Sequence, residues 1–305
     1  MSVIHCHVNN EWSTLKKVIV GTAKSWGPDP IAELAVDPKS REHVLAGTYP
    51  SENDVQFELN GLISLLESIG VLVLRPNIIE DLNQVFSRDV GIVINDKFIR
   101  TSMIASRAPE WEGIAHHFSD LSSYHITTPT SGVRIEGGDV MPMGNEIWVG
   151  YGEGADFEKY KTSRTNEKAI KWLKTEFPKH YIRSFALSKS DIEPRLNALH
   201  LDCCLSVLAG GHAIFHSDGM KHENDRQWIR DRFEGKIIEV DSQGMYDMHC
   251  NLFSISPTTV ISGKGFDTVN TQLRKWGYEV LETPMGETSK MGGLLRCVTL
   301  PIFRK

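Results

Sequence analysis

The sequence lacks the features that mark secreted and membrane-spanning proteins. Its 305 residues include five cysteines, an odd number, and the adjacent pair Cys203 and Cys204 is a poor basis for a disulfide framework. No stretch approaches the ~20 apolar residues that a membrane-spanning helix needs. Residues 1–8 lack the charged start and apolar run of a signal peptide. We therefore expect a soluble protein of a reducing compartment, the cytoplasm.

The sequence also lacks an excess of positive charge. Lys and Arg together number 33 against 39 Asp and Glu, which gives a net charge of −6. Because no basic surplus is available to neutralise phosphates, partners such as nucleic acids and anionic membranes are disfavoured. The hydrophobic content of 40% and the charged content of 24% are ordinary for a globular protein.

A unit of one or two polar residues, a strand, a tight turn and a second strand recurs along the chain. Its four copies cover residues 88–100, 138–150, 201–215 and 250–262, and helix-like segments follow at 165–177, 222–233 and 267–276. Hairpins are common in α/β proteins, but four in similar phase, about 50 residues apart, favour repetition of one unit. The pattern predicts an α/β fold with the units arranged around an axis.

The N-terminal part of the chain gives weaker signals. Residues 17–21 and 71–74 are typical of short buried strands, and the apolar spacing over 53–69 predicts a helix that ends at Gly70. Residues 25–52 are rich in Pro, Asp and Ser without clear periodicity. Since long loops in folded domains tend to be functional, we expect this one to cover a substrate.

In such an arrangement, the polar residues that open the repeated units lie at equivalent places near the axis. The sequence therefore predicts one central pocket that the following residues share: Asp89, Glu136 with Asp139, His200 with Asp202, and Cys297. Several carboxylates near a thiol oppose ordinary acyl transfer, because negative charge raises the pKa of the thiol. They suit a cationic substrate such as a guanidinium, which paired carboxylates recognise.

The same motifs resemble those of a known group of enzymes. The chain resembles the guanidino-group-modifying enzymes, which include arginine deiminases, dimethylarginine dimethylaminohydrolases and amidinotransferases. The motifs that carry the resemblance are Asn10–Ala23, Phe86–Asp89, Glu136–Asp139, Ser163–Asn166, His200–Asp202 and Gly292–Pro301. The resemblance implies a pentein fold (an α/β-propeller) over residues 1–305 as a single domain, with five pseudosymmetric ββαβ units around a central active site.

The resemblance also implies catalytic roles. Cys297 is then the nucleophile, His200 the general acid and base, and Glu136 the carboxylate that pairs with His200. A cysteine gives the strong nucleophile that the poorly electrophilic guanidinium carbon requires. A histidine can protonate the departing nitrogen and then activate water. We expect no metal and no other cofactor.

Further residues are implied in substrate binding. Asp89 and Asp202 would hold the guanidinium nitrogens, with Asp139 from the same acidic motif as Glu136. Arg164 and Arg296 match positions that lie near the carboxylate end of the substrate in the hydrolases. The partner is then a small guanidino compound, and a homo-oligomer is compatible with the sequence.

The members of this group divide by the fate of the amidino group on the cysteine. Water gives a ureido product plus ammonia or an amine, whereas a second amine gives amidino transfer. The Arg296–Cys297 pair and the Ser163–Asn166 motif resemble the hydrolases, and Asn10–Ala23 resembles the transferases. We favour the hydrolase and keep arginine, methylated arginine and other guanidino compounds open as substrates.

Other interpretations fit single motifs better than the whole set. His200 alone is more often a structural histidine, and Asp89 beside Arg88 could be an ion pair at a strand end. A metal-dependent hydrolase could use ligands from His116, His117, His200, Asp202, His212, His216 and His249, but no pair has a typical ligand spacing. A non-enzymatic binder would need neither Cys297 nor His200. We treat Cys203 and Cys204 as core residues that point to opposite faces of a strand.

Overall fold

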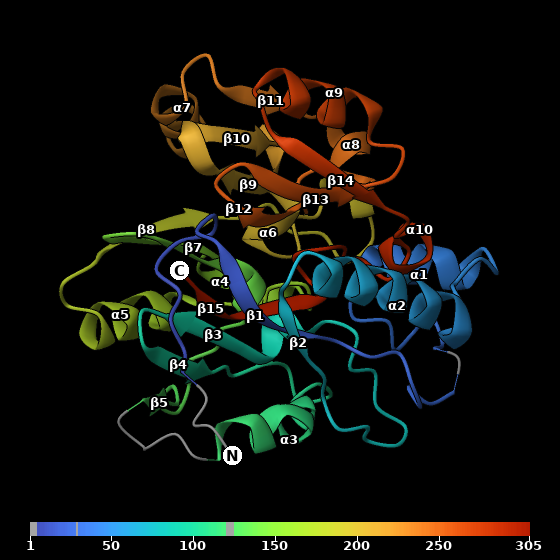
Figure 1. The fold of residues 1–305 in the computed structure, drawn as a ribbon. Helices are drawn as coiled ribbons and strands as arrows, with labels where there is room; N and C mark the ends of the chain where they lie inside the picture. The colour runs from blue at the N-terminus through green and yellow to red at the C-terminus, as the bar shows by residue number, and fades with distance from the viewer. Residues whose placement is uncertain (1–4, 29, 120–124) are drawn as a thin grey trace.

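The strands of the protein form five three-stranded sheets. A computed structural model describes residues 5–28, 30–119 and 125–305 (Figure 1). Of residues 1–8, whose pattern argued against a signal peptide, residues 1–4 lie outside these ranges. Within the described ranges, the helices are too short or too polar to cross a bilayer.

Four of the sheets follow one plan. An antiparallel hairpin is followed by a helical connection and a third strand that pairs in parallel with the second. A short turn can join only antiparallel neighbours, whereas a parallel pair needs a longer crossover. The sheets are β3 (Gly91–Ile94), β4 (Lys97–Arg100) and β5 (Ile126–Thr127); β6 (Val140–Met143), β7 (Glu146–Tyr151) and β8 (Tyr181–Ala186); β9 (Leu205–Leu208), β10 (His212–Phe215) and β11 (Ile237–Glu239); and β12 (Phe253–Ser256), β13 (Thr259–Gly263) and β14 (Glu279–Thr283).

The fifth sheet joins the two ends of the chain. Strand β1 (Leu15–Val20) pairs antiparallel with β15 (Thr299–Arg304) and parallel with β2 (Leu72–Leu74). Figure 1 shows β1 and β15 side by side in the middle of the molecule, between the other sheets. With this sheet the predicted five ββαβ units are complete, so the predicted α/β architecture is confirmed.

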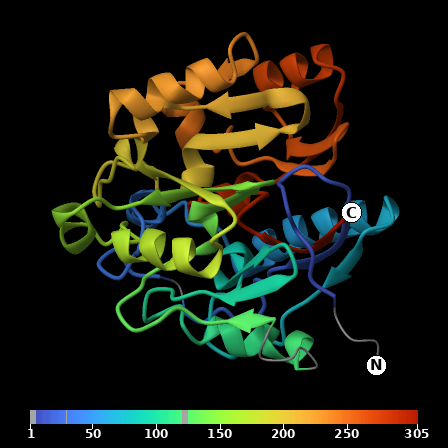
Figure 2. The same ribbon diagram turned by 90° about the vertical axis from the view of Figure 1, so that its left-hand side faces the viewer.

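Helices lie on the outer side of the sheets, as Figure 2 shows for α5 and α7. Helix α2 begins after Ser51, whose side chain accepts a hydrogen bond from the Asp54 amide, and it buries one apolar face. The helices are α1 (Pro38–Leu45), α2 (Glu52–Ser68), α3 (Glu110–Ile114), α4 (Ala155–Lys159), α5 (Glu167–Glu176), α6 (Leu201–Cys204), α7 (Glu223–Arg232), α8 (Ser242–Tyr246), α9 (Asp267–Lys275) and α10 (Gly286–Ser289).

The prediction that residues 25–52 form a loop throughout is wrong, because α1 lies inside this stretch. Asp37 Oδ1 accepts a hydrogen bond from the Ser40 amide (2.8 Å) and caps the helix, and Pro38 occupies its first turn. Both residues are typical of a helix start, but the low apolar content of the segment gives no periodic signal. The residues before Asp37 remain irregular.

The strand predicted from Leu201 onward is also partly wrong. Residues 201–204 form the single turn α6, and only then does β9 begin. Asp139 Oδ1 accepts a hydrogen bond from the Leu201 amide (3.0 Å), a long-range contact that a local pattern cannot reveal. Cys203 and Cys204 therefore do not occupy opposite faces of a strand, although both are buried as expected.

Helix α2 is fixed to α10 by one buried carboxylate. Glu58 Oε1 accepts a hydrogen bond from the Glu287 amide (2.9 Å), and Glu58 Oε2 accepts from the amide and the hydroxyl of Thr288 (both 2.8 Å). Because α10 precedes Cys297 by only a few residues, this contact also positions the segment that carries the thiol.

We predict that Glu58→Ala lowers the free energy of unfolding by about 2–4 kcal/mol. The substitution leaves the buried amide and hydroxyl of Thr288 and the part-buried amide of Glu287 without their acceptor, and each unsatisfied buried group costs about 1–3 kcal/mol before partial relaxation. Urea denaturation measures the change. Glu67→Ala, at an exposed site on the same helix, should leave the stability nearly unchanged, and equal effects of the two substitutions would contradict the prediction.

Candidate active site

The polar residues that open the repeated units lie in short helical turns before the first strands. Asp89 lies in the turn Ser87–Val90 and Asp139 in the turn Gly137–Asp139. Asp89 Oδ1 accepts a hydrogen bond from the Gly138 amide (2.9 Å), and Asp139 in turn binds the Leu201 amide. Each carboxylate thus connects its own unit to the next one around the axis.

The remaining units continue this chain of contacts and close it. Asn251, just before β12, donates through Nδ2 to the carbonyl oxygen of Asp202 (3.1 Å). Its Oδ1 accepts from the amides of Arg296 (2.9 Å) and Cys297 (3.2 Å). The Cys297 carbonyl accepts from the Arg88 amide (3.0 Å), next to Asp89. We call this closed set of contacts the axial ring.

Close packing in the axial ring requires glycine at position 138. A Cβ atom there would lie 2.6 Å from His200 Nδ1, well inside van der Waals contact. Gly138 therefore lets the backbone approach the imidazole closely, and Gly137 does the same for the Arg88 carbonyl oxygen, which a Cβ atom at position 137 would overlap.

A cavity of about 290 Å³ opens at the ring. Its walls include four of the predicted residues, Asp89, Arg164, His200 and Cys297. The irregular segment before α1 contributes further wall residues, from Pro30 to Asp37. The stretch expected to cover a substrate thus lines the cavity.

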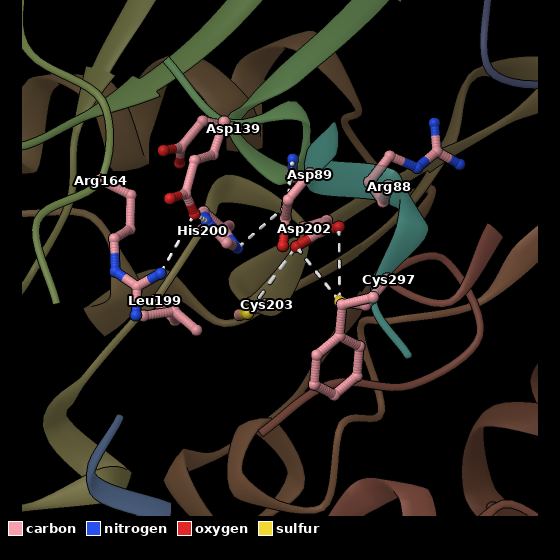
Figure 3. A network of polar contacts seen from close by, with 12 residues as sticks. Arg88, Asp89, Asp139, Arg164, Leu199, His200, Asp202, Cys203 and Cys297 are labelled. Atoms are coloured by element: carbon pink, nitrogen blue, oxygen red, sulfur yellow. Dashed lines mark hydrogen bonds and ion pairs between the residues drawn. The ribbon is translucent and has the colours of Figure 1, made fainter. Parts of the chain in front are cut away.

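His200 lies in a strongly charged environment at the cavity wall. Its Nε2 lies 2.9 Å from Glu136 Oε2, and Arg164 Nη1 donates to the same oxygen (3.2 Å) (Figure 3). Burial lowers the pKa of His200, but the carboxylates of Asp89, Asp139 and Glu136 outweigh burial and raise this pKa to about 9. The imidazole is therefore protonated at neutral pH.

The carboxyl groups around His200 differ in their proton affinity. Burial raises the pKa of Glu136, but Arg164, His200 and Arg107 outweigh it, so this pKa falls below its ordinary value. Burial raises the pKa of Asp139 to about 6. Glu136 is thus a firmly ionised partner for the imidazolium.

The thiol of Cys297 is neutral in this state. Figure 3 shows Asp202 between the sulfur atoms of Cys203 and Cys297; Cys297 Sγ lies 3.8 and 4.0 Å from the carboxylate oxygens. Burial, followed by the charges of Asp202 and Asp89, raises the pKa of Cys297 well above its ordinary value. Asn251 Nδ2 donates a hydrogen bond to the sulfur (3.2 Å). A cation placed beside the sulfur would lower this pKa.

Not every predicted residue reaches the cavity. Asp139, Glu136 and Asp202 are fully buried behind its wall. Arg296, expected near the carboxylate end of a substrate, lies deeper and donates to Asp202 (2.8 Å) and to Glu11 (3.0 and 3.1 Å).

Arg164 does line the cavity, although its guanidinium is occupied. It donates to Glu136 and, through Nη2, to the carbonyl oxygen of Val36 (2.7 Å) in the segment before α1.

Arg107 and Glu110 also line the cavity, and the sequence interpretation missed them. Arg107 Nη1 donates to Asp89 Oδ2 (2.7 Å), Nη2 donates to the carbonyl oxygen of Phe86 (2.9 Å), and the guanidinium forms a bidentate pair with Glu110 (2.7 and 3.0 Å). The two residues follow β4 in a segment without strand or helix periodicity. In contrast, Asn251 opens the fourth repeated unit, and this position could have identified it.

Asp89, Glu136 and His200 come close enough together to be considered as metal ligands. One ligand atom from each lies within 4.8 Å of the others. However, Asp89 is paired with Arg107 and Glu136 with Arg164, and two guanidinium groups beside a dication would repel it. The other predicted ligands are not part of this cluster. The donor set therefore fits an ion-pair network better than a metal centre.

Proteins of known structure share this fold. The N-terminal domain of ArgZ, an arginine dihydrolase from cyanobacteria, superposes with a TM-score of 0.77 at 18% identity, over 94% of this chain and 98% of that one. The inosamine-phosphate amidinotransferase of Streptomyces griseus gives a TM-score of 0.76 at 19% identity, over 98% and 97%. The five ββαβ units around a central cavity are thus the pentein fold of the guanidino-group-modifying enzymes.

Sequence comparison identifies the family. Residues 52–304 match the family model described as N,N dimethylarginine dimethylhydrolase, eukaryotic, and the chain belongs to this family. The protein YkgA of Bacillus subtilis, which is uncharacterised, is 30% identical over 246 residues, 80% of this chain and 78% of YkgA. The bifunctional arginine dihydrolase/ornithine cyclodeaminase ArgZ of Synechocystis is 22% identical over 223 residues, and the match spans only 29% of its length. At this level the protein is an enzyme that acts on guanidino groups.

We predict that His200 makes the stability of the protein depend on pH between about 6.5 and 9. Its pKa rises from the ordinary value of 6.5 to about 9 in the folded state, so the stabilisation is complete below pH 6.5 and is lost as pH rises through 9. The full effect is on the order of 3 kcal/mol. Urea unfolding of the wild type and of His200→Gln across this range measures it. The difference in free energy of unfolding between the wild type and His200→Gln should shrink as pH rises. A difference that stays constant would show that His200 does not titrate in this way.

Proposed function

We propose that the protein is a cysteine-dependent hydrolase of the guanidinium group of arginine or a related guanidino compound. The observation that carries the proposal is the composition of one cavity wall. Cys297 and His200 line the cavity together with Asp89, and the Asp89 carboxylate binds a guanidinium group in this structure, that of Arg107. The cavity thus combines a nucleophile, a charged acid and a carboxylate of the required specificity.

In the first step the substrate cation ionises the nucleophile. A guanidinium beside Asp89 lowers the pKa of Cys297, and the thiol proton leaves to solvent. Sγ then attacks the guanidinium carbon and forms a C–S bond. His200, held as imidazolium by Glu136, donates a proton to the departing nitrogen, so the C–N bond breaks and ammonia or an amine is released.

In the second step water replaces the sulfur. Neutral His200 accepts a proton from water, which attacks the amidino carbon on Cys297. The C–S bond breaks, the thiolate is restored, and a ureido product leaves. Asn251 donates to Sγ and would stabilise the thiolate both before attack and after release.

Arg107 gives the cavity a means of recognising the rest of the substrate. A substrate guanidinium that takes the place of Arg107 on Asp89 frees the Arg107 guanidinium, which Glu110 still holds. Arg107 can then face a substrate carboxylate. Arg164 lies in the same cavity wall, but its donors are held by Lys161, Glu136 and Val36, so it contributes its charge rather than a free N–H group. We therefore assign the direct contact to Arg107, and we assign Arg296 to the positioning of Asp202.

The relatives support covalent chemistry but leave two reactions open. A variant of the ArgZ domain has been solved covalently bound to a reaction intermediate, which supports hydrolysis through a cysteine adduct. The amidinotransferase of Streptomyces griseus is matched over the whole of this chain at 22% identity. Amidino transfer from arginine to an acceptor amine is therefore the second candidate function. Metal-dependent hydrolysis is the third, because Asp89, Glu136 and His200 lie close together.

We predict that Cys297→Ala folds normally but loses turnover by several orders of magnitude, because it removes the group that forms the covalent intermediate. A haloamidine should label the wild-type protein at Cys297, as measured by mass spectrometry of peptides. Cys203→Ala is the matched control, since its sulfur also lies near Asp202 (3.7 Å) but does not line the cavity. Turnover by the Cys297→Ala variant, or labelling at Cys203, would overturn the assignment.

We predict that arginine or an ω-methylated arginine gives a ureido product plus ammonia or amine, without an acceptor and in the presence of a strong chelator. The test is a panel of guanidino compounds, with and without added amines, analysed by mass spectrometry. Agmatine, which lacks the carboxylate, should have a kcat/KM roughly tenfold or more below that of arginine, because Arg107 loses a charge-assisted contact. A new guanidino compound formed from the added amine would favour amidino transfer. Reversible loss of activity in the presence of chelator would favour metal-dependent hydrolysis.

A further inference from the structure

A second cavity, of about 360 Å³, lies on the other side of α1 from the catalytic cavity. Its size falls within the range of small-molecule sites, and the lining residues differ from those of the catalytic cavity. The polar and aromatic residues that matter for its chemistry are Lys39, His43, Tyr246, His249, Lys264 and Lys290. They come from α1, the region of α8, the turn after β13, and α10.

The charge of the lining favours an anion. Lys39, Lys264 and Lys290 all line the cavity, whereas Asp247 is the one acidic residue among the lining residues that the structure describes. Lys290 is paired with Glu287 (2.7 Å), and the Asp247 carboxylate accepts two hydrogen bonds from Gln243 (3.0 Å each). Lys264 is exposed and has no side-chain partner within the described part of the chain. The unbalanced charge is therefore positive.

Lys39 is the buried element of this cavity. It is only 5% exposed, and its Nζ donates to the carbonyl oxygen of Tyr246 (2.5 Å) and to Ser289 Oγ (2.8 Å). An ammonium has three donors, so one is left for a ligand. Asp247 and Asp37 act on this ammonium electrostatically, but no carboxylate of the described residues forms an ion pair with it, so its buried charge is only partly compensated. An anion in the cavity would supply that counter-ion.

The remaining walls suit an organic body. The Tyr246 ring lies 4.4 Å from Lys39 Nζ, and the Phe266 ring lies 4.3 Å from that of His249. Burial lowers the pKa of His43 and of His249, so both imidazoles are neutral at pH 7. The ammonium groups thus stand beside flat, uncharged surfaces. This combination fits a small organic anion that carries a carboxylate or a phosphate.

The two cavities share the elements that separate them. Helix α1 and its cap present Asp37 and Ser40 to the catalytic cavity, and Lys39 and His43 to the second one. The segment from α10 to the thiol does the same: Ser289 and Lys290 line the second cavity, whereas Met291–Gly293 and Cys297 line the catalytic one. Figure 1 shows α1 and α10 adjacent, as the contact between Lys39 and Ser289 requires.

We infer that the second cavity is an effector site for a small organic anion, which binds Lys39 and Lys264 and, through α1 and the segment 285–297, changes the kcat/KM of the catalytic cavity. Binding itself does not depend on which guanidino reaction the protein catalyses. By linkage, a change in substrate affinity requires the same change in anion affinity.

The binding test uses isothermal titration of the full chain with citrate and, separately, with inorganic phosphate, at matched ionic strength. We expect saturable binding of at least one of these two anions. A tighter affinity for citrate would indicate a carboxylate ligand, and a tighter affinity for phosphate would indicate a phosphate ligand. Lys264→Ala should weaken binding about fivefold, the effect of one exposed charge pair. Lys275→Ala, an exposed lysine of α9 outside the lining, should not. Absence of saturable binding, or equal effects of the two substitutions, would overturn the site.

The coupling test measures kcat/KM for the best guanidino substrate with and without the bound anion. Effectors typically change affinity by roughly five- to 150-fold. We expect the kcat/KM of the wild type to change by a factor within this range as anion is added. In Lys264→Ala, the anion concentration that gives half of this change should be higher. Saturable binding without any change in kcat/KM would overturn the coupling. If no guanidino substrate is turned over, the coupling is tested by measuring the affinity for the anion before and after a haloamidine has reacted in the catalytic cavity. An unchanged anion affinity would likewise overturn the coupling.

Discussion

The active site depends on the axial ring, the closed set of hydrogen bonds between the turns that open the five units. Asp89 binds the backbone of the next turn, Asp139 the one after it, and Asn251 binds the segment of Cys297. The ring is completed when the Cys297 carbonyl accepts from the Arg88 amide. Because β15 begins two residues after Cys297 and pairs with β1, the pairing that closes the fold also fixes the position of the Cys297 thiol.

The ring concentrates buried charge, and this charge is balanced locally. Asp89, Glu136 and Asp202 are each paired with an arginine: Arg107, Arg164 and Arg296 respectively. Removing one partner of such a pair costs about 3–5 kcal/mol, because the remaining charge is left buried and unpaired. The same carboxylates act on the two titratable groups at the cavity wall. They raise the pKa of His200 to about 9, and burial together with Asp202 and Asp89 raises the pKa of Cys297, which favours an imidazolium beside a neutral thiol.

The sequence predicted the parts of the site that repeat. Hairpins with polar residues at their starts placed Asp89, His200 and Cys297 in one pocket, and the structure brings these three to one cavity wall. The orientation of Arg296 was not predictable, because its partner Glu11 lies 285 residues away in sequence. Arg107 was missed because it lies in an irregular segment, where neither periodicity nor motif spacing carries information. Helix α1 and the turn α6 depend on a cap and a distant carboxylate, and both escape pattern analysis.

The side chain of Asn251 illustrates how strictly such a ring defines chemistry. Its oxygen faces two backbone N–H groups, and its nitrogen faces a carbonyl oxygen and the sulfur of Cys297. Each end of the planar amide is therefore matched to its neighbours, and rotation by 180° would reverse every contact. An aspartate has nearly the same shape, yet it would set a second anion against the sulfur lone pairs. Conversion of this amide to an acid, a spontaneous form of chemical ageing in proteins, would thus place a carboxylate oxygen against both the sulfur of Cys297 and the carbonyl oxygen of Asp202.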